Sequence, residues 1–126
     1  MDKDIDAALD SGVEMVHVFA STSDVQLQDS MHATRQEALE RSVEAVKRVK
    51  EAGATCMYSP MDATRTDEQF LIDVIEAVSE AGTDWINITD TCGVATPRRF
   101  YEMVETVVSH TDAGVDVHTH DDFGLA

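Results

Sequence analysis

The stretch that decides the fold is AGTDWINITDT, residues 81–91. It opens with a small residue and a glycine, a pair that commonly ends a helix. Residues 85–88 then form an apolar run with the length of a buried strand. Polar residues follow from Thr89 and lead to Gly93. The stretch therefore predicts a helix end, a buried strand and a polar loop in succession.

The same succession recurs along the chain, with glycines at positions 12, 53, 82 and 114. Helices are expected over residues 5–11 and after three threonines that read as helix caps. Thr34 with Glu37 and Thr66 with Gln69 have the capping-box spacing, and Thr96 precedes a proline. In the second helix an apolar face is expected at Leu39, Val43, Val46 and Lys50. The strands are expected at 15–19, 55–58, 85–88 and 115–118, with polar loops at 21–24, 59–65 and 89–95.

Alternating strands and helices predict an α/β fold with a parallel sheet. A doubly wound sheet and a (β/α)₈ barrel both fit this alternation, but no Gly-x-Gly-x-x-Gly follows a strand, which disfavours dinucleotide binding. The loops after the strands are polar and the returns before them short, as in a barrel with its site at the carboxyl ends. Four units make about half a barrel. We therefore expect a partial TIM (β/α)₈ barrel, with residues 1–126 as the central part of the catalytic domain and further strands outside. Its open edges predict self-association of the segment alone.

Acidic residues outnumber basic ones by 25 to 9, and the formal net charge is -16. Such a surface repels nucleic acid and anionic membranes, so neither is expected as a partner. No apolar run has transmembrane length and no basic leader opens the chain, which favours a cytoplasmic protein. Cys56 and Cys92 are too few for a disulfide framework and fit a reducing compartment.

The acidic excess also leads to the hypothesis of a protein adapted to high salt, as in a halophilic archaeon. Salt screens repulsion between like charges, so the melting temperature is expected to rise from low to molar salt. Thermal melting followed by circular dichroism measures this, and a melting temperature that does not rise with salt contradicts the hypothesis.

Two histidines one residue apart, His118 and His120, end the last expected strand. Residues i and i+2 of a strand share a face, so both imidazoles should project together and suit one metal ion. Asp121, Asp122 and Gly124 follow with further acceptors and a tight turn. A hard divalent ion also takes carboxylate and water oxygens. A further ligand is therefore expected from outside this chain.

Other polar side chains lie at or near the ends of the expected strands, where one rim of a barrel would bring them together beside the histidine pair. Each also has a structural interpretation. His17 could be a core histidine, Ser59 before Pro60 a turn residue, and Asp90 the start of an Asx-type turn. The full set of candidates is His17, Ser21, Ser59, Asn87, Asp90, Thr91, His118 and His120.

Residues 118–126, HTHDDFGLA, resemble the His-x-His-Asn/Asp-Asp-x-Gly-x-Ala signature of the 2-isopropylmalate, homocitrate and citramalate synthases, in the DRE-TIM metallolyase superfamily. Residues 87–93, NITDTCG, resemble the loop after the fifth strand of these enzymes. Residues 59–65, SPMDATR, resemble the loop after the fourth strand, and residues 17–23 the end of the third. The motifs stand in the family's order and cover essentially the whole chain.

The resemblance implies a TIM barrel that condenses acetyl-CoA, its co-substrate, with a 2-oxo acid in a metal-assisted Claisen reaction, followed by thioester hydrolysis. It implies a divalent metal (Mg²⁺, Mn²⁺ or Zn²⁺) and a homodimer in the full-length form. The implied metal ligands are His118 and His120. Thr91 would hydrogen-bond the carboxylate of the oxo acid, and the pocket for its side chain would be lined by His17, Ser59 and Asn87.

The chain departs from the family pattern at three points. The strand that carries an arginine and a third metal ligand, an aspartate, is absent, and so are the later strands and the C-terminal parts. Met61 stands where a glutamate is common. The resemblance therefore assigns no catalytic acid or base within the chain, which is expected to be inactive alone.

Met57 bears on the choice of substrate. In homocitrate synthases the residue at this position, two before the Ser59 equivalent, is typically an arginine that binds the distal carboxylate. An apolar residue cannot pair with a second carboxylate, whose burial would be unfavourable. We therefore expect 2-oxoisovalerate, giving 2-isopropylmalate for leucine biosynthesis, with pyruvate second.

Three alternatives stay open from the sequence. The chain could come from a citramalate or homocitrate synthase. It could come from a metal-dependent aldolase or lyase of the same superfamily, which the resemblance at residues 59–65 and 87–93 fits less well. A non-enzymatic, metal-binding half barrel is the third.

Overall fold

The computed structural model describes residues 2–126 and places four parallel strands in one sheet, in the order β1-β2-β3-β4. Each strand pairs with the next one along the chain, so β1 and β4 lie at the edges. This confirms the predicted α/β class and parallel sheet. The elements are α1 (Asp2–Asp10), β1 (Met15–Ser21), α2 (Asp24–Gln26), η1 (Leu27–Met31), α3 (Arg35–Glu51), β2 (Thr55–Met61), η2 (Ala63–Arg65), α4 (Glu68–Glu80), β3 (Trp85–Asp90), α5 (Pro97–Ser109) and β4 (Gly114–Thr119).

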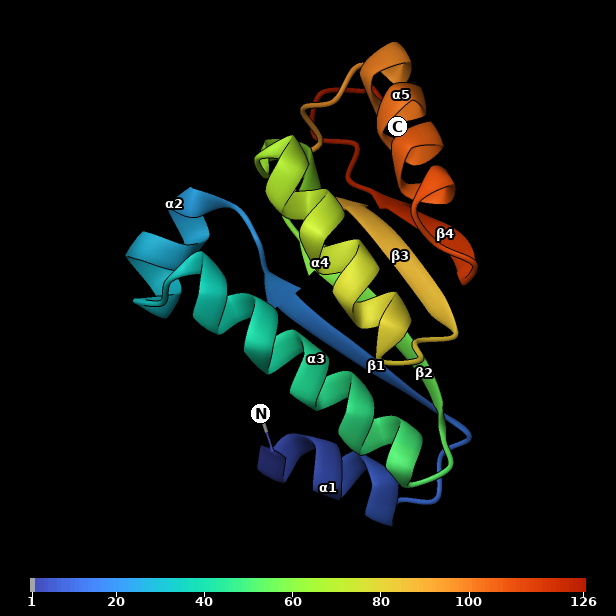
Figure 1. Cartoon of the computed structure of the whole chain (residues 1–126). Helices are drawn as coiled ribbons and strands as arrows, with labels where there is room; N and C mark the ends of the chain where they lie inside the picture. The colour runs from blue at the N-terminus through green and yellow to red at the C-terminus, as the bar shows by residue number, and fades with distance from the viewer. Residues whose placement is uncertain (1) are drawn as a thin grey trace.

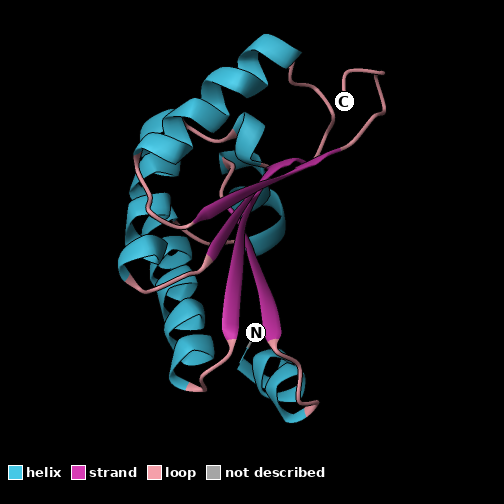
Figure 2. Cartoon of the chain, turned by 90° about the vertical axis from the view of Figure 1, so that its right-hand side faces the viewer, coloured by secondary structure: helices cyan, strands magenta, loops and turns pink. Residues whose placement is uncertain are grey.

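Helices α3, α4 and α5 lie on one side of the sheet (Figures 1 and 2), and the core lies between them and the strands. Alternate strand residues point into this core, including Val16, Val18, Tyr58, Ile86 and Ile88. The residues between them face the other side of the sheet, where Met15, Phe19 and Trp85 are exposed. The period-2 alternation thus separates a face that packs against the helices from an open face, most clearly in β1.

Two of the three predicted helix caps are confirmed. Thr34 caps α3 in a capping box, in which its hydroxyl accepts from the Glu37 amide and its own amide donates to the Glu37 carboxylate. Thr96 accepts from the Arg99 amide at the start of α5. The third expectation, a cap at Thr66, is wrong.

Asp67, not Thr66, caps α4, because its carboxylate accepts from the Phe70 amide at 3.0 Å. The Thr66 hydroxyl is buried and has tertiary partners instead: it donates to the Asp62 carbonyl at 3.0 Å and lies 2.7 Å from the Thr22 hydroxyl. A local capping pattern was therefore overridden by a contact between two loops that are distant in sequence.

The face of α3 that packs on the sheet also differs from the prediction. The buried residues are Ala38, Ser42, Ala45, Val46 and Val49, so only Val46 of the four expected residues is among them. Small side chains let the helix approach β2, where the Ser42 and Tyr58 hydroxyls meet at 2.9 Å. Burial raises the pKa of Tyr58 to about 12.

Residues 24–31 form a short helical segment, α2 and η1, that the sequence pattern did not predict. Only Leu27 is buried in it, so the segment has no apolar periodicity to detect. Ser23 caps it and His32 ends it with a positive φ of 47°. No helix within residues 2–126 is long and apolar enough to cross a membrane.

Candidate active site

A cavity of about 230 Å³ lies on the open face, toward the carboxyl ends of the strands. All six residues predicted to bind metal or substrate line it, so the structure brings together side chains from all four strands and from the loop after β3. Apolar groups from Phe19 and Met61 complete the wall. The lining residues are His17, Phe19, Ser59, Met61, Asn87, Thr89, Thr91, His118 and His120.

Two other strand-end candidates, Ser21 and Asp90, are buried and do not line this cavity, so the expectation that they join the site is wrong. The Asp90 carboxylate accepts from the Thr64 hydroxyl and from the Val94 and Ala95 amides. It therefore holds the loop after β3 in place, as the turn interpretation predicted. Met57 also lies outside the lining; it pairs in register with His17 on β1.

The two histidines lie side by side, as their spacing predicted. The rings of His118 and His120 are stacked, with centroids 5.2 Å apart and planes 9° from parallel. Both residues are exposed, and no side chain or backbone group within residues 2–126 hydrogen-bonds either ring. Their nitrogen lone pairs are therefore available to an external ligand.

Gly93 holds the loop after β3 against the end of β4. Its φ is +62°, and a Cβ built there would lie 2.6 Å from the carbonyl oxygen of His120. The His120 amide also donates to the Asp90 carbonyl at 3.2 Å. The position of His120 thus depends on a backbone contact that only glycine permits.

Side chains from all four strands join in one chain of hydrogen bonds across the sheet. The His17 Nε2 atom lies 2.6 Å from the Ser59 hydroxyl, which donates to Asn87 Oδ1 at 3.0 Å. Asn87 Nδ2 in turn donates to Asp116 Oδ2 at 2.9 Å. Sequence reasoning missed Asp116, although it stands two residues before His118 and hence on the same face of the strand.

Burial is the main reason why the pKa of His17 lies below its ordinary value, and nearby His118 lowers it further. The Asp116 carboxylate acts in the opposite direction. Near neutral pH His17 is therefore an uncharged imidazole, with one nitrogen that donates and one that accepts.

Behind the cavity, Asp62 organises the loop after β2. Its carboxylate is fully buried and accepts from the Ser23 hydroxyl and the Arg65 guanidinium, and this contact raises the pKa of Arg65. The backbone of Asp62 has a φ of 66°, and its amide donates to the Thr91 hydroxyl at 2.9 Å. Because that hydroxyl already accepts from Asp62, its proton is directed toward other acceptors.

The donor set fits a divalent metal ion in part. The exposed rings of His118 and His120 supply two nitrogen ligands. Within residues 2–126, however, no three side chains of the ligating types are grouped to hold an ion. Asp121 accepts from the Ala126 amide at 3.1 Å. His118 and His120 are thus two side chains in the cavity that could ligate a metal ion.

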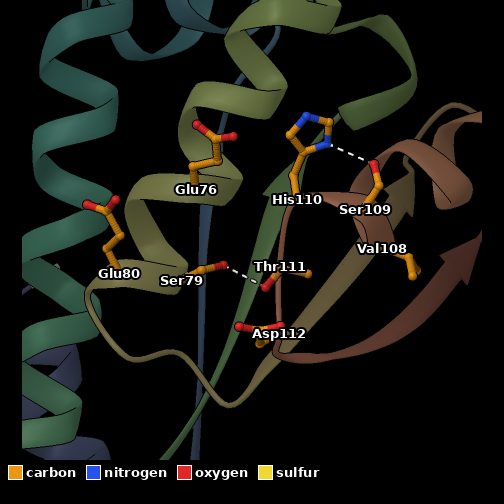
Figure 3. A pocket seen from close by; sticks show the side chains of 8 residues that line it. All are labelled: Glu76, Ser79, Glu80, Val108, Ser109, His110, Thr111 and Asp112. Carbon is orange, nitrogen blue, oxygen red and sulfur yellow. Dashed lines mark hydrogen bonds between the residues drawn. The ribbon is translucent and has the colours of Figure 1, made fainter.

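A larger cavity, of about 700 Å³, lies between the end of α4 and the end of α5 with the loop that follows it (Figure 3). Its hydroxyls are already paired, since Ser79 and Thr111 lie 2.7 Å apart and Ser109 lies 3.0 Å from His110 Nδ1. It shares no residue with the histidine cavity.

Parallel βα units with a cavity at the carboxyl ends of the strands define the chain as part of a TIM barrel. The chain belongs to the HMGL-like family, which matches residues 1–126.

Named relatives and solved structures agree with this assignment. The chain is 48% identical over 124 residues to the "Probable 2-isopropylmalate synthase" of Methanosarcina mazei, covering 98% of this chain and 24% of the relative. It is 45% identical over 125 residues to the 2-isopropylmalate synthase of Sulfolobus acidocaldarius, covering 98% and 32%. The chain thus spans a quarter to a third of these relatives.

Two solved structures share its fold. Hydroxymethylglutaryl-CoA lyase from Pseudomonas aeruginosa superposes with a TM-score of 0.83 at 25% identity, covering 98% of this chain and 43% of the lyase. The Bacillus subtilis HMG-CoA lyase gives a TM-score of 0.87 at 21% identity, with 98% and 44% covered.

Proposed function

We propose that this chain is the central part of the catalytic barrel of an acyltransferase that condenses acetyl-CoA with a 2-oxo acid. The preferred oxo acid is 2-oxoisovalerate and the product 2-isopropylmalate, a step of leucine biosynthesis in the cytoplasm. The observation that carries the proposal is the exposed histidine pair on the rim of a cavity with an apolar wall. The names of relatives at 45–48% identity support the same reaction.

In this proposal the chain's own residues bind and orient the oxo acid. His118 and His120 hold a divalent metal ion, which when bound polarises the keto group toward attack. The third metal ligand and the catalytic base come from residues outside these 126. Without them the chain alone is inactive. The full-length enzyme is proposed to be a homodimer.

Thr91 is suited to bind the carboxylate of the oxo acid. Its oxygen accepts from the Asp62 amide, and its longest contact, 3.5 Å to the Thr89 hydroxyl, is a weak one. The hydroxyl proton, which donates only this weak bond to Thr89, can instead donate to a carboxylate oxygen. Phe19 and Met61 offer apolar surface to the side chain of the substrate.

The reaction is tested on the intact enzyme that contains this chain, supplied with acetyl-CoA and 2-oxoisovalerate, pyruvate or 2-oxoglutarate. Release of the free thiol of coenzyme A is followed. We expect the highest kcat/KM with 2-oxoisovalerate. Preference for 2-oxoglutarate would refute the proposed preference for an apolar side chain, and no thiol release with any oxo acid would refute the proposed reaction.

The metal ligands are tested by isothermal titration with Mn²⁺ or Zn²⁺. His118→Ala is expected to weaken binding by about tenfold or more, because one of two nitrogen ligands is lost. His110→Ala, which removes a histidine outside the cavity, serves as the control. Equal affinity of both variants would contradict the assignment. Tight stoichiometric binding by the 126-residue chain would mean that Asp121 or Asp122 is also a ligand.

A lyase is the second candidate function, favoured by the close superposition on hydroxymethylglutaryl-CoA lyase from Pseudomonas aeruginosa. The two reactions differ in a measurable product. A synthase liberates free coenzyme A from acetyl-CoA in the presence of an oxo acid, whereas cleavage of a metal-bound acid needs no acetyl-CoA.

A further inference from the structure

We propose that Asp116 is a positioning and specificity-determining residue, which sets the direction of the hydrogen-bond chain that ends at His17. In doing so it favours a 2-oxo acid with an apolar side chain over one with an anionic side chain. The part of the inference that concerns substrates rests on the proposed function, whereas the direction of the hydrogen bonds from Asp116 to His17 does not.

The direction follows from the fact that an ionised carboxylate can only accept hydrogen bonds. Asp116 therefore requires the amide nitrogen of Asn87 to face it, at the observed 2.9 Å. The Asn87 oxygen then faces Ser59, whose hydroxyl must donate to it at 3.0 Å. A hydroxyl has one proton. Ser59 can therefore only accept from His17, and Nε2 must carry the imidazole proton.

The opposite direction is possible for the same four positions if residue 116 can donate. Asn87 would turn its oxygen toward residue 116 and its nitrogen toward Ser59. The hydroxyl would then donate to His17 Nε2, and the imidazole proton would move to Nδ1. With a carboxylate at 116 this arrangement places two acceptors against each other, which is unfavourable. The side chain at position 116 on β4 thus decides the tautomer of His17 on β1, although the two are linked only through Asn87 and Ser59.

The tautomer changes what the cavity offers to a ligand. In the inferred direction the protons of His17 Nε2 and Ser59 are both used, and only one amide hydrogen of Asn87 is spare. The nitrogen of His17 that remains is an acceptor. A distal carboxylate would therefore find only the spare amide hydrogen of Asn87 to donate to it, and Asp116, which is hydrogen-bonded to Asn87, adds a carboxylate behind that residue. An apolar side chain meets Phe19 and Met61 instead.

The test compares Asp116→Asn with Asp112→Asn in the intact enzyme. Both remove one carboxylate while keeping the size of the side chain, but residue 112 precedes β4 and takes no part in the hydrogen-bond chain. Asp116→Asn is expected to reduce the kcat/KM ratio of 2-oxoisovalerate to 2-oxoglutarate by about tenfold, since polar recognition separates substrates at least this strongly. Asp112→Asn should leave the ratio unchanged. A ratio that falls equally in both variants, or in neither, overturns the specificity role.

The tautomer is read separately from the ¹⁵N shifts of the histidine rings, with the His17 signals assigned by their loss in His17→Gln. Wild type is expected to show only the Nε2–H form, and Asp116→Asn a mixture with the Nδ1–H form. If the contact between residue 116 and Asn87 were merely structural, Asp116→Asn would not change the tautomer, because asparagine preserves that contact. An unchanged tautomer overturns the positioning role. If wild type releases no coenzyme A with any oxo acid, the proposed function fails, and the ring shifts still decide the role of Asp116 in positioning.

Discussion

Replacement of Gly93 by alanine is expected to lower the free energy of unfolding by about 3 kcal/mol and to weaken metal binding at the histidine pair. The new Cβ would lie 2.6 Å from the His120 carbonyl oxygen and 3.1 Å from its carbonyl carbon. These are backbone atoms and cannot rotate away as a flexible side chain could. Relief therefore requires the loop after β3 to separate from the end of β4, which displaces His120. Urea unfolding followed by circular dichroism measures the first effect, and titration with Mn²⁺ the second.

Gly53→Ala is the matched control. Gly53 has a φ of +81°, also in the left-handed region, but nothing lies within 4 Å of a Cβ built on it. Gly53→Ala should lower the free energy of unfolding only by the cost of a left-handed alanine, about 1 kcal/mol. Its metal affinity should not change. If the two variants are equally destabilised, the contact between Gly93 and His120 does not hold the site.

Asp62→Asn is expected to destabilise the protein by about 2–3 kcal/mol. Asparagine keeps the size of the side chain and tolerates the φ of 66°. It removes the charge of a fully buried carboxylate that pairs with Arg65 at 2.7 Å. The loss lies below that of a completely buried pair, because the Arg65 side chain is 39% exposed and water can replace part of the interaction.

The control for Asp62→Asn is Asp24→Asn. Asp24 pairs with Arg35 at the same distance of 2.7 Å, but both side chains are more than two-fifths exposed. An exposed pair contributes little to stability, because water screens the attraction between its charges. Urea unfolding of both variants should therefore separate them clearly. If the free energy of unfolding falls no more in Asp62→Asn than in Asp24→Asn, the buried Asp62 carboxylate does not stabilise the loop after β2.

Much of the site could be predicted because its signals are local. The spacing of His118 and His120 predicts that they share a face, and the rings do stack. Glycines and apolar runs predict the strand order in which His17, Ser59 and Asn87 come together. The errors arose where a side chain forms a hydrogen bond with a partner that is distant in sequence. Thr66 reads as a cap until Thr22 and the Asp62 carbonyl are placed beside it.

The sequence by itself determined the α/β class, the four strands and the cluster of polar groups at their carboxyl ends. It could do so because side-chain periodicity and glycine positions act within a few residues. Only the tertiary structure decided that Asp116 joins the site while Asp90 does not. Asp90 is the last residue of β3, whereas Asp116 lies within β4 between two valines. Their roles depend on which strand lies alongside: Asp116 faces Asn87 across the sheet, whereas Asp90 accepts from the amides of its own loop.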